Sequence, residues 1–401
     1  MAEIIVAGGG IGGLATALAV SAHGHRAVVL ERADTFAEIG AGIQLAPNGL
    51  HALDALGVGE AVRASAVRMA ELRFMDGVTG EHVASLPLTD RYRDRFDSPY
   101  VVAHRAELHK ALLDACRATD SVTLHGSSPV TDYTQNDASA TALLADGTRV
   151  TGDAVIGADG VHSAIRARLV DDGEPRVSGI TVYRAVTPME QVPENLRFDR
   201  SVVWWAGPGC HFVHYPIAGG RFLNLAASRA DGRTDAFAGV PVDRDVALLE
   251  LAALGGTAQR LLELGADWKT WMLVDRDPVA RWTDGRVALL GDAAHPMLHY
   301  AAQGACQALE DAVVLGQSLH GTPPERLPAR LLAYNAARRE RTTRIQLAAR
   351  ASTRLWHPAG AAARARNTML GALSADELHE HVAWMHGTRV DRRTGRKGVA
   401  A

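Results

Sequence analysis

A short apolar run that passes directly into a glycine-rich turn restricts the fold of this chain more than any other feature. Residues 4–7 are apolar and mostly β-branched, as in a buried strand of a parallel sheet. Residues 8–13 read GGGIGG, and an Ala- and Leu-rich stretch with helical character follows. A second apolar run at residues 26–30 ends in an acid, Glu31. The order strand, glycine turn, helix, strand and acid predicts a nucleotide-binding βαβ unit.

Each part of this unit has a physical task in a Rossmann-like domain. Gly8 permits a tight turn, Gly10 lets the backbone approach a pyrophosphate, and Gly13 lets the helix pack closely on the strand. The helix N-terminus offers free N–H groups and the positive end of its dipole to the phosphates. Glu31 can accept hydrogen bonds from a ribose diol, and Arg32 follows it in the predicted cofactor site. This motif alone leaves FAD and NAD as alternatives.

Two further strands end in a glycine and an acid. Residues 154–160 form an apolar run that leads to Asp159, and residues 287–292 form another that leads to Gly291 and Asp292. Ligands of parallel α/β sheets bind at the carboxyl ends of the strands. Three separate segments of this type are therefore expected to converge on one ligand.

The three motifs in this order resemble those of the single-component flavoprotein aromatic hydroxylases, the FAD monooxygenases typified by p-hydroxybenzoate hydroxylase. The resemblance implies tightly bound FAD. NADH or NADPH, with NADH favoured, would bind transiently, because the sequence has no second complete GxGxxG unit. It also implies O2 as co-substrate and a flavin C4a-hydroperoxide that hydroxylates an electron-rich ring.

The same resemblance assigns further residues to the FAD site. Residues 38–45 are similar to a segment that lies beside the flavin and the substrate, and their glycines permit close contact with a flat ligand. Arg105 matches an arginine on the FAD side of the site, although a surface cation at a helix start is the alternative. Free N–H groups at a helix start near Ala305 could stabilise negative charge on the reduced flavin. The cofactor residues predicted beyond the first motif are Gly42, Ile43, Arg105, Asp159, Gly291, Asp292, Pro296, Gly304 and Ala305.

The middle of the chain changes to short runs rich in β-branched and aromatic residues, which predict an antiparallel sheet. The turn at residues 218–221 predicts a hairpin. Further strands are expected within residues 71–90. The main predicted strands are residues 180–186, 201–205, 210–217 and 222–227.

The predicted fold class is α/β, with a Rossmann-like FAD-binding domain, an antiparallel-sheet substrate domain and a C-terminal helical arm. In the arm, helical spacing and alternating charge in residues 325–355 predict a long helix that faces solvent. Residues 389–397 are expected to be disordered. The predicted FAD-binding domain comprises residues 1–75, 98–177 and 271–322, the substrate domain residues 76–97 and 178–270, and the arm with its flexible tail residues 323–401.

Candidate catalytic residues lie in the predicted strand 210–217. Because side chains alternate along a strand, His211 and Tyr215 share one face, and His214 points to the other side and is expected to face outward. A satisfied strand histidine and a sheet tyrosine are the structural alternative. The chain is similar to the 3-hydroxybenzoate 6-hydroxylase and salicylate hydroxylase branch, where a histidine and a tyrosine line the active site. His211 is therefore the predicted base for a phenol, and Tyr215 the orienting or relay residue.

His299, Gln44 and Tyr183 are the predicted substrate-binding residues. Relatives often carry glutamine at the position of His299. This difference bears on which substrate binds more than on the type of reaction. The branch implies 6-hydroxylation of 3-hydroxybenzoate to gentisate. The alternatives are a salicylate-type hydroxylase, a hydroxylase of N-heterocycles or natural-product phenols, and a flavin-dependent dehydrogenase or redox sensor without oxygen insertion.

Composition excludes other classes of partner. The net charge of −3 provides no basic surface for nucleic acid or anionic membrane. The sequence has no apolar run long enough to span a membrane and no signal-peptide pattern, so a cytoplasmic protein is expected. Cys116, Cys210 and Cys306 are widely spaced and predict buried thiols rather than a disulfide or a metal site. The expected partners are a small aromatic substrate and, for the protein itself, a homodimer.

Overall fold

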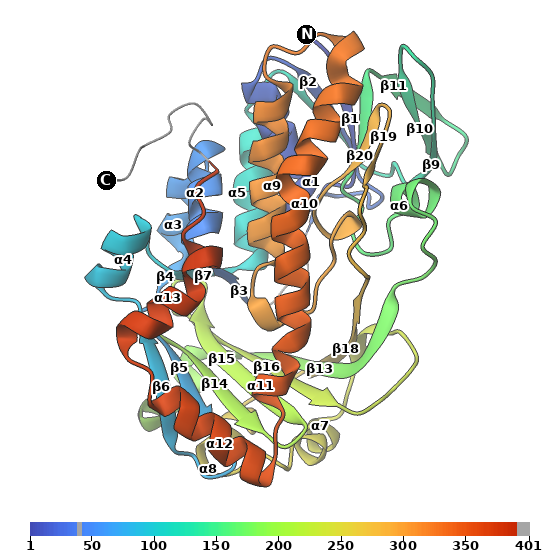
Figure 1. Ribbon diagram of the computed structural model, residues 1–401. Coiled ribbons are helices and arrows are strands. Elements are labelled where there is room, and N and C mark those ends of the chain that lie inside the picture. The colour runs from blue at the N-terminus through green and yellow to red at the C-terminus, as the bar shows by residue number, and fades with distance from the viewer. Residues whose placement is uncertain (38–41, 391–401) are drawn as a thin grey trace.

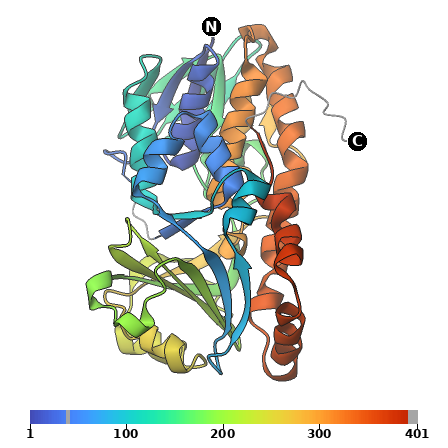
Figure 2. The same cartoon turned by 90° about the vertical axis from the view of Figure 1, so that its left-hand side faces the viewer.

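The computed structural model describes residues 1–37 and 42–390. Residues 38–41, where the sequence places part of the flavin-side segment, lie outside the described residues, and so does the expected disordered tail from residue 391 onward. The chain forms two stacked layers, a parallel sheet with its helices above and a large antiparallel sheet below (Figure 1). A C-terminal run of helices joins them along one side (Figure 2).

The upper layer is built on a six-stranded sheet with the order β19-β20-β12-β1-β2-β8. All neighbouring pairs are parallel except β19 and β20. The strands of the three glycine and acid motifs, β1, β12 and β20, are adjacent, so their carboxyl ends meet at one edge as predicted. The bounds are β1 Glu3–Ala7, β2 Arg26–Leu30, β8 Val122–His125, β12 Ala154–Gly157, β19 Thr283–Asp284 and β20 Val287–Leu289.

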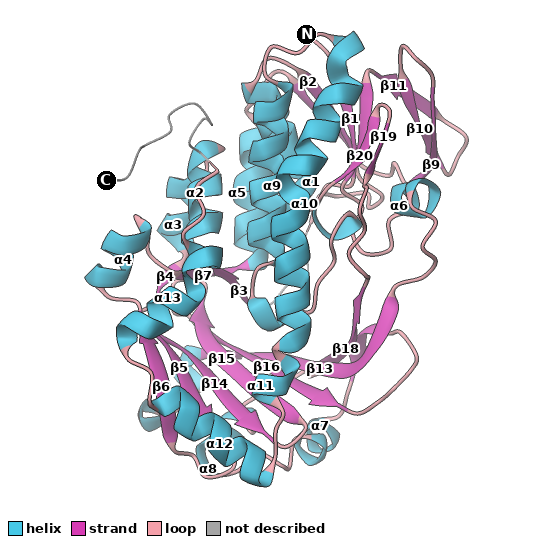
Figure 3. Cartoon of the chain, viewed as in Figure 1, coloured by secondary structure: helices cyan, strands magenta, loops and turns pink. Residues whose placement is uncertain are grey.

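Helices cover this sheet because their apolar residues need burial. Most of α1, Ile11–Ala22, is buried between the sheet, α5 (Arg105–Arg117) and α9 (Gly304–Leu319). Figure 3 shows these helices side by side on one face of the sheet. A small sheet of β9 Val130–Gln135, β10 Ala140–Leu144 and β11 Arg149–Gly152 contacts β1 and β12, and α6 (Ala164–Leu169) contacts β9. Ser163 caps α6 by accepting a hydrogen bond from the Arg166 amide.

Three short helices and a small sheet connect the layers. Pro47 is the first residue of α2, Pro47–Ala55. Its fixed φ suits the first helical position, where an N–H would lack an intrahelical partner. The remaining elements here are α3 Gly59–Ser65, α4 Asp90–Phe96, β3 Gly42–Leu45, β4 Val67–Arg68 and β7 Val101–His104.

The lower layer is an eight-stranded sheet with the order β17-β18-β13-β16-β15-β14-β5-β6. Only the pair β14 and β5 is parallel. The hairpin at residues 218–221 is confirmed, since it joins β15 to β16. The boundary expected between residues 75 and 76 falls inside β5. The bounds are β5 Glu71–Asp76, β6 His82–Pro87, β13 Arg176–Pro188, β14 Ser201–Gly207, β15 Cys210–Ile217, β16 Phe222–Ala230, β17 Ala238–Pro241 and β18 Lys269–Asp275.

Both faces of this sheet are covered. One face packs against α7, Arg244–Glu250, and α8, Gly256–Leu262, to form a core of its own that includes Phe212, Trp205 and Leu225. The other face points toward the parallel layer. Short 3-10 turns complete the connections at Met189–Gln191, Glu194–Leu196, Gly291–Ala293, His299–Ala301 and Pro324–Arg326.

The arm consists of α10 Leu327–Ala351, α11 Thr353–Trp356, α12 Gly360–Gly371 and α13 Ala375–His386. The prediction that α10 faces solvent is wrong for part of its arginine run. Arg338 is only 2% exposed and bonds both Glu310 and Asp311 of α9, so it lies between the two helices. The prediction of disorder from residue 389 is also wrong at its start, because the Val390 carbonyl accepts a hydrogen bond from Gln317 at 2.6 Å. In the described part of the chain, no helix is both long and apolar enough to span a bilayer.

Candidate functional site

A cavity of about 670 Å³ lies between the two layers. Its upper wall is the edge where β1, β12 and β20 end, and its lower wall is formed by β13, β14, β15 and β16. The volume falls in the usual range for cofactor and ligand pockets. The topology therefore places the glycine motifs and the predicted catalytic strand on opposite sides of one cavity.

The first motif forms the turn that the sequence predicts. Gly8 has φ +107°, and a Cβ atom there would collide with the carbonyl of Ala158. A Cβ on Gly13 would collide with the carbonyl of Gly8, so α1 starts directly behind the turn. Glu31 accepts hydrogen bonds from the Gly9 amide at 2.6 Å and from the Ala33 amide at 3.0 Å, and it lines the cavity together with Arg32.

One carboxylate oxygen of Asp159, in the second motif, accepts no hydrogen bond from the described residues. Its Oδ2 accepts hydrogen bonds from the amides of Ala164 at 2.9 Å and Ile165 at 3.3 Å. Its Oδ1 is buried at the cavity and has no hydrogen-bond partner among the described residues. Burial raises the pKa of this carboxyl. An isolated buried acceptor is costly, so this atom fits a donor supplied by a ligand.

The third motif leads into a helix that starts at the cavity. Gly291 has φ +61°, and its amide donates to Asp311 Oδ2 at 3.0 Å. Asp292, Gly304 and Ala305 line the cavity, and no side chain caps the start of α9. The N–H groups in the first turn of α9 therefore face the cavity, where they would stabilise a negative charge on a bound ligand. Pro296 does not line the cavity; its carbonyl accepts a hydrogen bond from Gln346 at 2.9 Å, which fixes the loop instead.

Buried charges behind this loop hold it in place. His295 is fully buried and lies 2.5 Å from Asp311 Oδ2. Burial would raise the pKa of Asp311, but His295 and Arg338 beside it lower the pKa to about 2. Glu310 is paired with Arg338 and Arg341. This network makes the position of the Gly291 turn dependent on α10.

These features fit FAD. Two uncapped helix N-termini, those of α1 and α9, open on one cavity, as phosphates and an anionic ring would require. The glycine turns leave no space for side chains, and Asp159 offers an acceptor without a partner. Within the described ranges, no group of three His, Cys, Asp or Glu side chains is arranged to hold a metal ion.

The lower wall carries the predicted catalytic side chains. His211, Val213 and Tyr215 of β15 all line the cavity, as their alternation predicts. The expectation that His214 faces outward is wrong. His214 is fully buried in the core beneath the sheet, where it stacks near Phe212 and Trp205, because α7 and α8 cover that face.

His211 is held from two directions. Its Nδ1 lies 3.1 Å from Nε2 of His357, which belongs to the arm, and its ring packs against Trp356 and Tyr300. Burial, with His299 and His357 nearby, lowers the pKa of His211 well below 6.5. Burial therefore favours the neutral form of His211, in which one ring nitrogen has a free lone pair that can act as an acceptor.

His299 and Gln44 reach the cavity as predicted. His299 Nε2 lies 3.2 Å from the Ser228 hydroxyl, and burial lowers the pKa of His299 to about 3. Gln44 Oε1 accepts a hydrogen bond from the Tyr100 hydroxyl at 2.6 Å. Burial raises the pKa of Tyr215 to about 12, although Arg184 and Gln44 nearby favour its ionised form. Tyr215 is therefore a neutral hydrogen-bonding group.

The structure does not bring Tyr183 to the cavity. Tyr183 pairs with Ala227 and points into the core beneath the sheet, and its neighbour Arg184 lines the cavity instead. Arg184 Nε is buried without a hydrogen-bond partner, and no carboxylate contacts the guanidinium among the described residues. Burial lowers the pKa of Arg184. The sequence signal for Arg184 is a single charge within an apolar strand.

Apart from Gly13, Pro296 and Tyr183, the structure gathers the predicted residues at one cavity. Further lining residues that the sequence did not indicate come from the sheet and the arm. The predicted residues that line the cavity are Gly8, Gly10, Glu31, Arg32, Gly42, Ile43, Gln44, Arg105, Asp159, His211, Tyr215, Gly291, Asp292, His299, Gly304 and Ala305. The residues not predicted include Arg184, Trp204, Asn224, Ser228, Tyr300 and Trp356.

This fold and this cavity define an FAD-dependent oxidoreductase with a separate substrate sheet. Residues 1–349 match the family described as FAD binding domain. A 3-hydroxybenzoate 6-hydroxylase of Aquipseudomonas alcaligenes is 45% identical over 386 residues, which cover 96% of this chain and 97% of the relative. A 3-hydroxybenzoate 6-hydroxylase of Polaromonas naphthalenivorans (strain CJ2) is 38% identical over 387 residues, 96% of each chain.

The solved structure of Klebsiella pneumoniae HpxO complexed with FAD and uric acid has a TM-score of 0.83 and 27% identity to this chain, and the match covers 97% of this chain and 96% of HpxO. The chain belongs to the FAD binding domain family. Within that family it is an FAD-dependent aromatic hydroxylase, a flavoprotein monooxygenase.

Proposed function

We propose that the protein hydroxylates 3-hydroxybenzoate at C6 to give gentisate (2,5-dihydroxybenzoate), with NADH as the preferred reductant. The balanced reaction converts the substrate, O2, NADH and a proton into gentisate, NAD⁺ and water. The names of the relatives from Aquipseudomonas and Polaromonas support this substrate. The structure adds support from two side chains that face the cavity, Arg184 and His211.

One observation carries the proposal. The cavity holds a cation that lacks a carboxylate partner among the described residues, and it also holds a neutral base. Arg184 and His211 lie on β13 and β15, on the same face of the sheet, with β16 between them. A half-buried guanidinium whose Nε is buried without a hydrogen-bond partner is unfavourable, and a carboxylate satisfies it through two hydrogen bonds. A hydroxybenzoate carries a carboxylate and a phenol on one small ring, which matches this pair.

Neutral His211 supplies the acceptor for the phenol proton. Its Nε2 has no hydrogen-bond partner in the part of the chain that the structure describes, and its ring lines the cavity. Proton transfer from the phenol to Nε2 creates a phenolate, which makes the ring more electron-rich and therefore easier to hydroxylate. The Ser228 and His299 pair lies beside His211 and can orient the same oxygen.

FAD, when bound, carries the electrons from NADH to O2 and delivers one oxygen atom to the ring. The chain contributes binding, orientation and a dry site. Trp204, Tyr300 and Trp356 surround His211 at the cavity wall, and such apolar cover excludes water from the reacting groups. We assign FAD contacts to the glycine turns, Glu31 and Asp159.

Substrate-stimulated turnover tests the proposal. The purified yellow protein is supplied with NADH, O2 and one of three compounds: 3-hydroxybenzoate, salicylate or 3-hydroxybenzyl alcohol. We expect 3-hydroxybenzoate to stimulate NADH oxidation most and gentisate to be the product, identified by chromatography and mass. His211→Gln should lower the coupled rate by roughly 10²–10⁴-fold. Faster coupled turnover of salicylate, or NADH oxidation without a hydroxylated product, would reject the assignment.

A further inference from the structure

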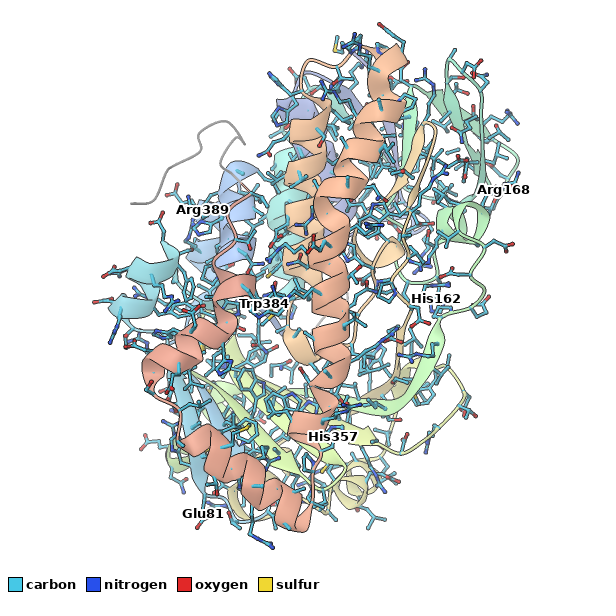
Figure 4. All side chains as sticks on the ribbon, viewed as in Figure 1. Glu81, His162, Arg168, His357, Trp384 and Arg389 are labelled. Atoms are coloured by element: carbon cyan, nitrogen blue, oxygen red, sulfur yellow. The ribbon has the colours of Figure 1, made fainter. Side chains whose placement is uncertain are left out.

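The arm docks one histidine directly onto the candidate base. His357 follows α11, and its backbone carbonyl accepts a hydrogen bond from the Gly209 amide at 3.0 Å, in the turn that leads into β15. Figure 4 labels His357 where the arm reaches the antiparallel sheet. The backbone contact fixes the imidazole ring of His357 next to His211, two residues farther along that turn and strand. The arm therefore completes the site from outside the two layers.

The contacts of the two imidazole rings favour one arrangement of protons. His357 Nε2 lies 3.1 Å from His211 Nδ1 and 3.4 Å from the Tyr300 hydroxyl. In the arrangement that suits a base, the single lone pair of His357 Nε2 accepts from His211 Nδ1, which lies closer than the Tyr300 hydroxyl, so His211 carries its proton on Nδ1. Its Nε2 is then free of a proton and faces the cavity, which is the tautomer that a base for a phenol needs.

The two rings also differ in burial. His211 is 4% exposed, whereas His357 is half-buried. Nδ1 of His357 is not buried and has no hydrogen-bond partner among the described residues, so that side of its ring is open to water. The pair forms a continuous path from the cavity to solvent.

We propose that His357 is the relay residue that carries the phenolic proton from His211 to solvent. The inference rests on the proposed phenol substrate. The phenol O–H bond breaks as Nε2 of His211 gains the proton. His211 then gives its Nδ1 proton to Nε2 of His357, and His357 releases its own Nδ1 proton to water. One proton enters and one leaves, and both rings end neutral.

The surroundings of the pair keep both rings neutral between transfers. Burial lowers the pKa of His357 to about 4, and the pKa of His211 is also lowered. The titratable groups that face the pair are His299 and Tyr300 from the loop before α9, with Arg184 of β13 near His299. None of them supplies an anion that would trap the proton on an imidazolium. A proton therefore passes through the pair rather than staying on it.

Proton release on substrate binding tests the relay in the FAD-loaded protein. 3-Hydroxybenzoate is mixed rapidly with the oxidised protein in weak buffer that contains a pH-indicator dye. His357→Gln keeps a side-chain oxygen that can accept from His211 Nδ1, but an amide cannot relay a proton. We expect this variant to release the proton roughly tenfold more slowly or worse. His381→Gln, an exposed histidine on α13, should match the unmodified protein.

Chemical rescue separates a relay from a positioning role. His357→Ala should be slow, and added imidazole should restore the proton-release rate in proportion to its concentration. Unmodified protein provides a second readout in mixtures of H2O and D2O, where two moving protons give a curved dependence of the rate on the deuterium fraction. A linear dependence, or a His357→Gln variant with normal FAD content and an unchanged release rate, would overturn the relay. If the unmodified protein shows no turnover of any phenolic acid, the proposed function fails instead.

Discussion

The backbone of Gly42 lies against the ring of Tyr215, with no room between them for a Cβ atom. The Gly42 amide donates to Asn224 Oδ1 at 3.0 Å, which joins β3 to the antiparallel sheet at the same point. Because Gly42, Tyr215 and Asn224 all line the cavity, a change at this glycine acts directly on the substrate side. The contact makes a small residue necessary where the two layers meet.

Gly42→Ala should therefore displace Tyr215 without unfolding the protein. We expect kcat/KM for 3-hydroxybenzoate to fall by roughly tenfold or more, because small displacements of orienting groups are costly. FAD content and melting temperature should change little. Gly80→Asn provides the control, since Gly80 lies in the open turn between β5 and β6 at φ +80°, a conformation that asparagine tolerates. Equal activity of the two variants would contradict this role of the contact.

Arg184→Met should weaken binding of the carboxylate specifically. Loss of one partner of a buried charge pair costs about 2–5 kcal/mol, so KM for 3-hydroxybenzoate should rise by roughly 30-fold or more. Turnover of 3-hydroxybenzyl alcohol, which has no carboxylate, should be nearly unaffected. Arg200→Met, at an exposed arginine before β14, serves as the matched control. Steady-state kinetics with both compounds decides the question, and a parallel loss for the two compounds would argue against carboxylate recognition.

Acid should destabilise the protein through its buried histidines. Burial lowers the pKa of His214 from 6.5 to about 3, and it has the same effect on His386. The unfolded chain therefore binds protons below pH 6.5 that the native protein does not bind until about pH 3. Above pH 6.5 each neutral buried histidine makes its full contribution to the free energy of unfolding. Between pH 6.5 and about pH 3 that free energy falls as the pH decreases, by up to about 1.4 kcal/mol per pH unit for each histidine.

His214→Leu tests this effect at one site. Neither ring nitrogen of His214 has a hydrogen-bond partner in the described part of the chain, so an apolar side chain of similar size should stabilise the protein by about 1 kcal/mol at neutral pH. The variant should also lose less stability than the unmodified protein between about pH 7.5 and pH 5.5. Urea unfolding at both pH values measures the difference. A steeper pH dependence in the variant would be inconsistent with a neutral buried His214.

Arg338→Met should destabilise the protein and weaken FAD binding together. Arg338 bonds Glu310 and Asp311 at 2.6 Å each, and Asp311 in turn holds the Gly291 amide. Removal of one partner from a buried charge network costs about 3–5 kcal/mol. Arg339→Met, at the next and exposed residue of α10, should change stability by less than about 0.5 kcal/mol. Thermal unfolding and FAD titration of the two variants provide the comparison.

The sequence predicted the cofactor side of the site better than the substrate side. Gly13 and Asp159 contact residues close to them in the sequence, and Gly8 takes a positive φ in its own turn, so both motifs are visible locally. The adjacency of β1, β12 and β20 follows from the rule that ligands bind at the carboxyl ends of parallel strands. The hairpin and the shared face of His211 and Tyr215 follow from turn composition and strand alternation.

The remaining features depend on contacts between distant segments. Tyr183 and Arg184 could not be assigned to a face, because both faces of β13 are covered and its register with β16 is a long-range property. Arg338 has the local pattern of a solvated helix, and only its partners on α9 show that it is buried. His357 lies 146 residues from His211 in the sequence, so no local pattern connects them.

The most direct test of the account measures where the oxygen atom goes. The FAD-loaded protein is given NADH, 3-hydroxybenzoate and O2 labelled with heavy oxygen, and the aromatic product is examined by mass spectrometry. We expect gentisate that carries one labelled oxygen atom, placed para to the original hydroxyl group, with one NADH consumed for each gentisate formed. NADH oxidation that yields only labelled hydrogen peroxide, or gentisate whose new oxygen comes from water, would contradict the account.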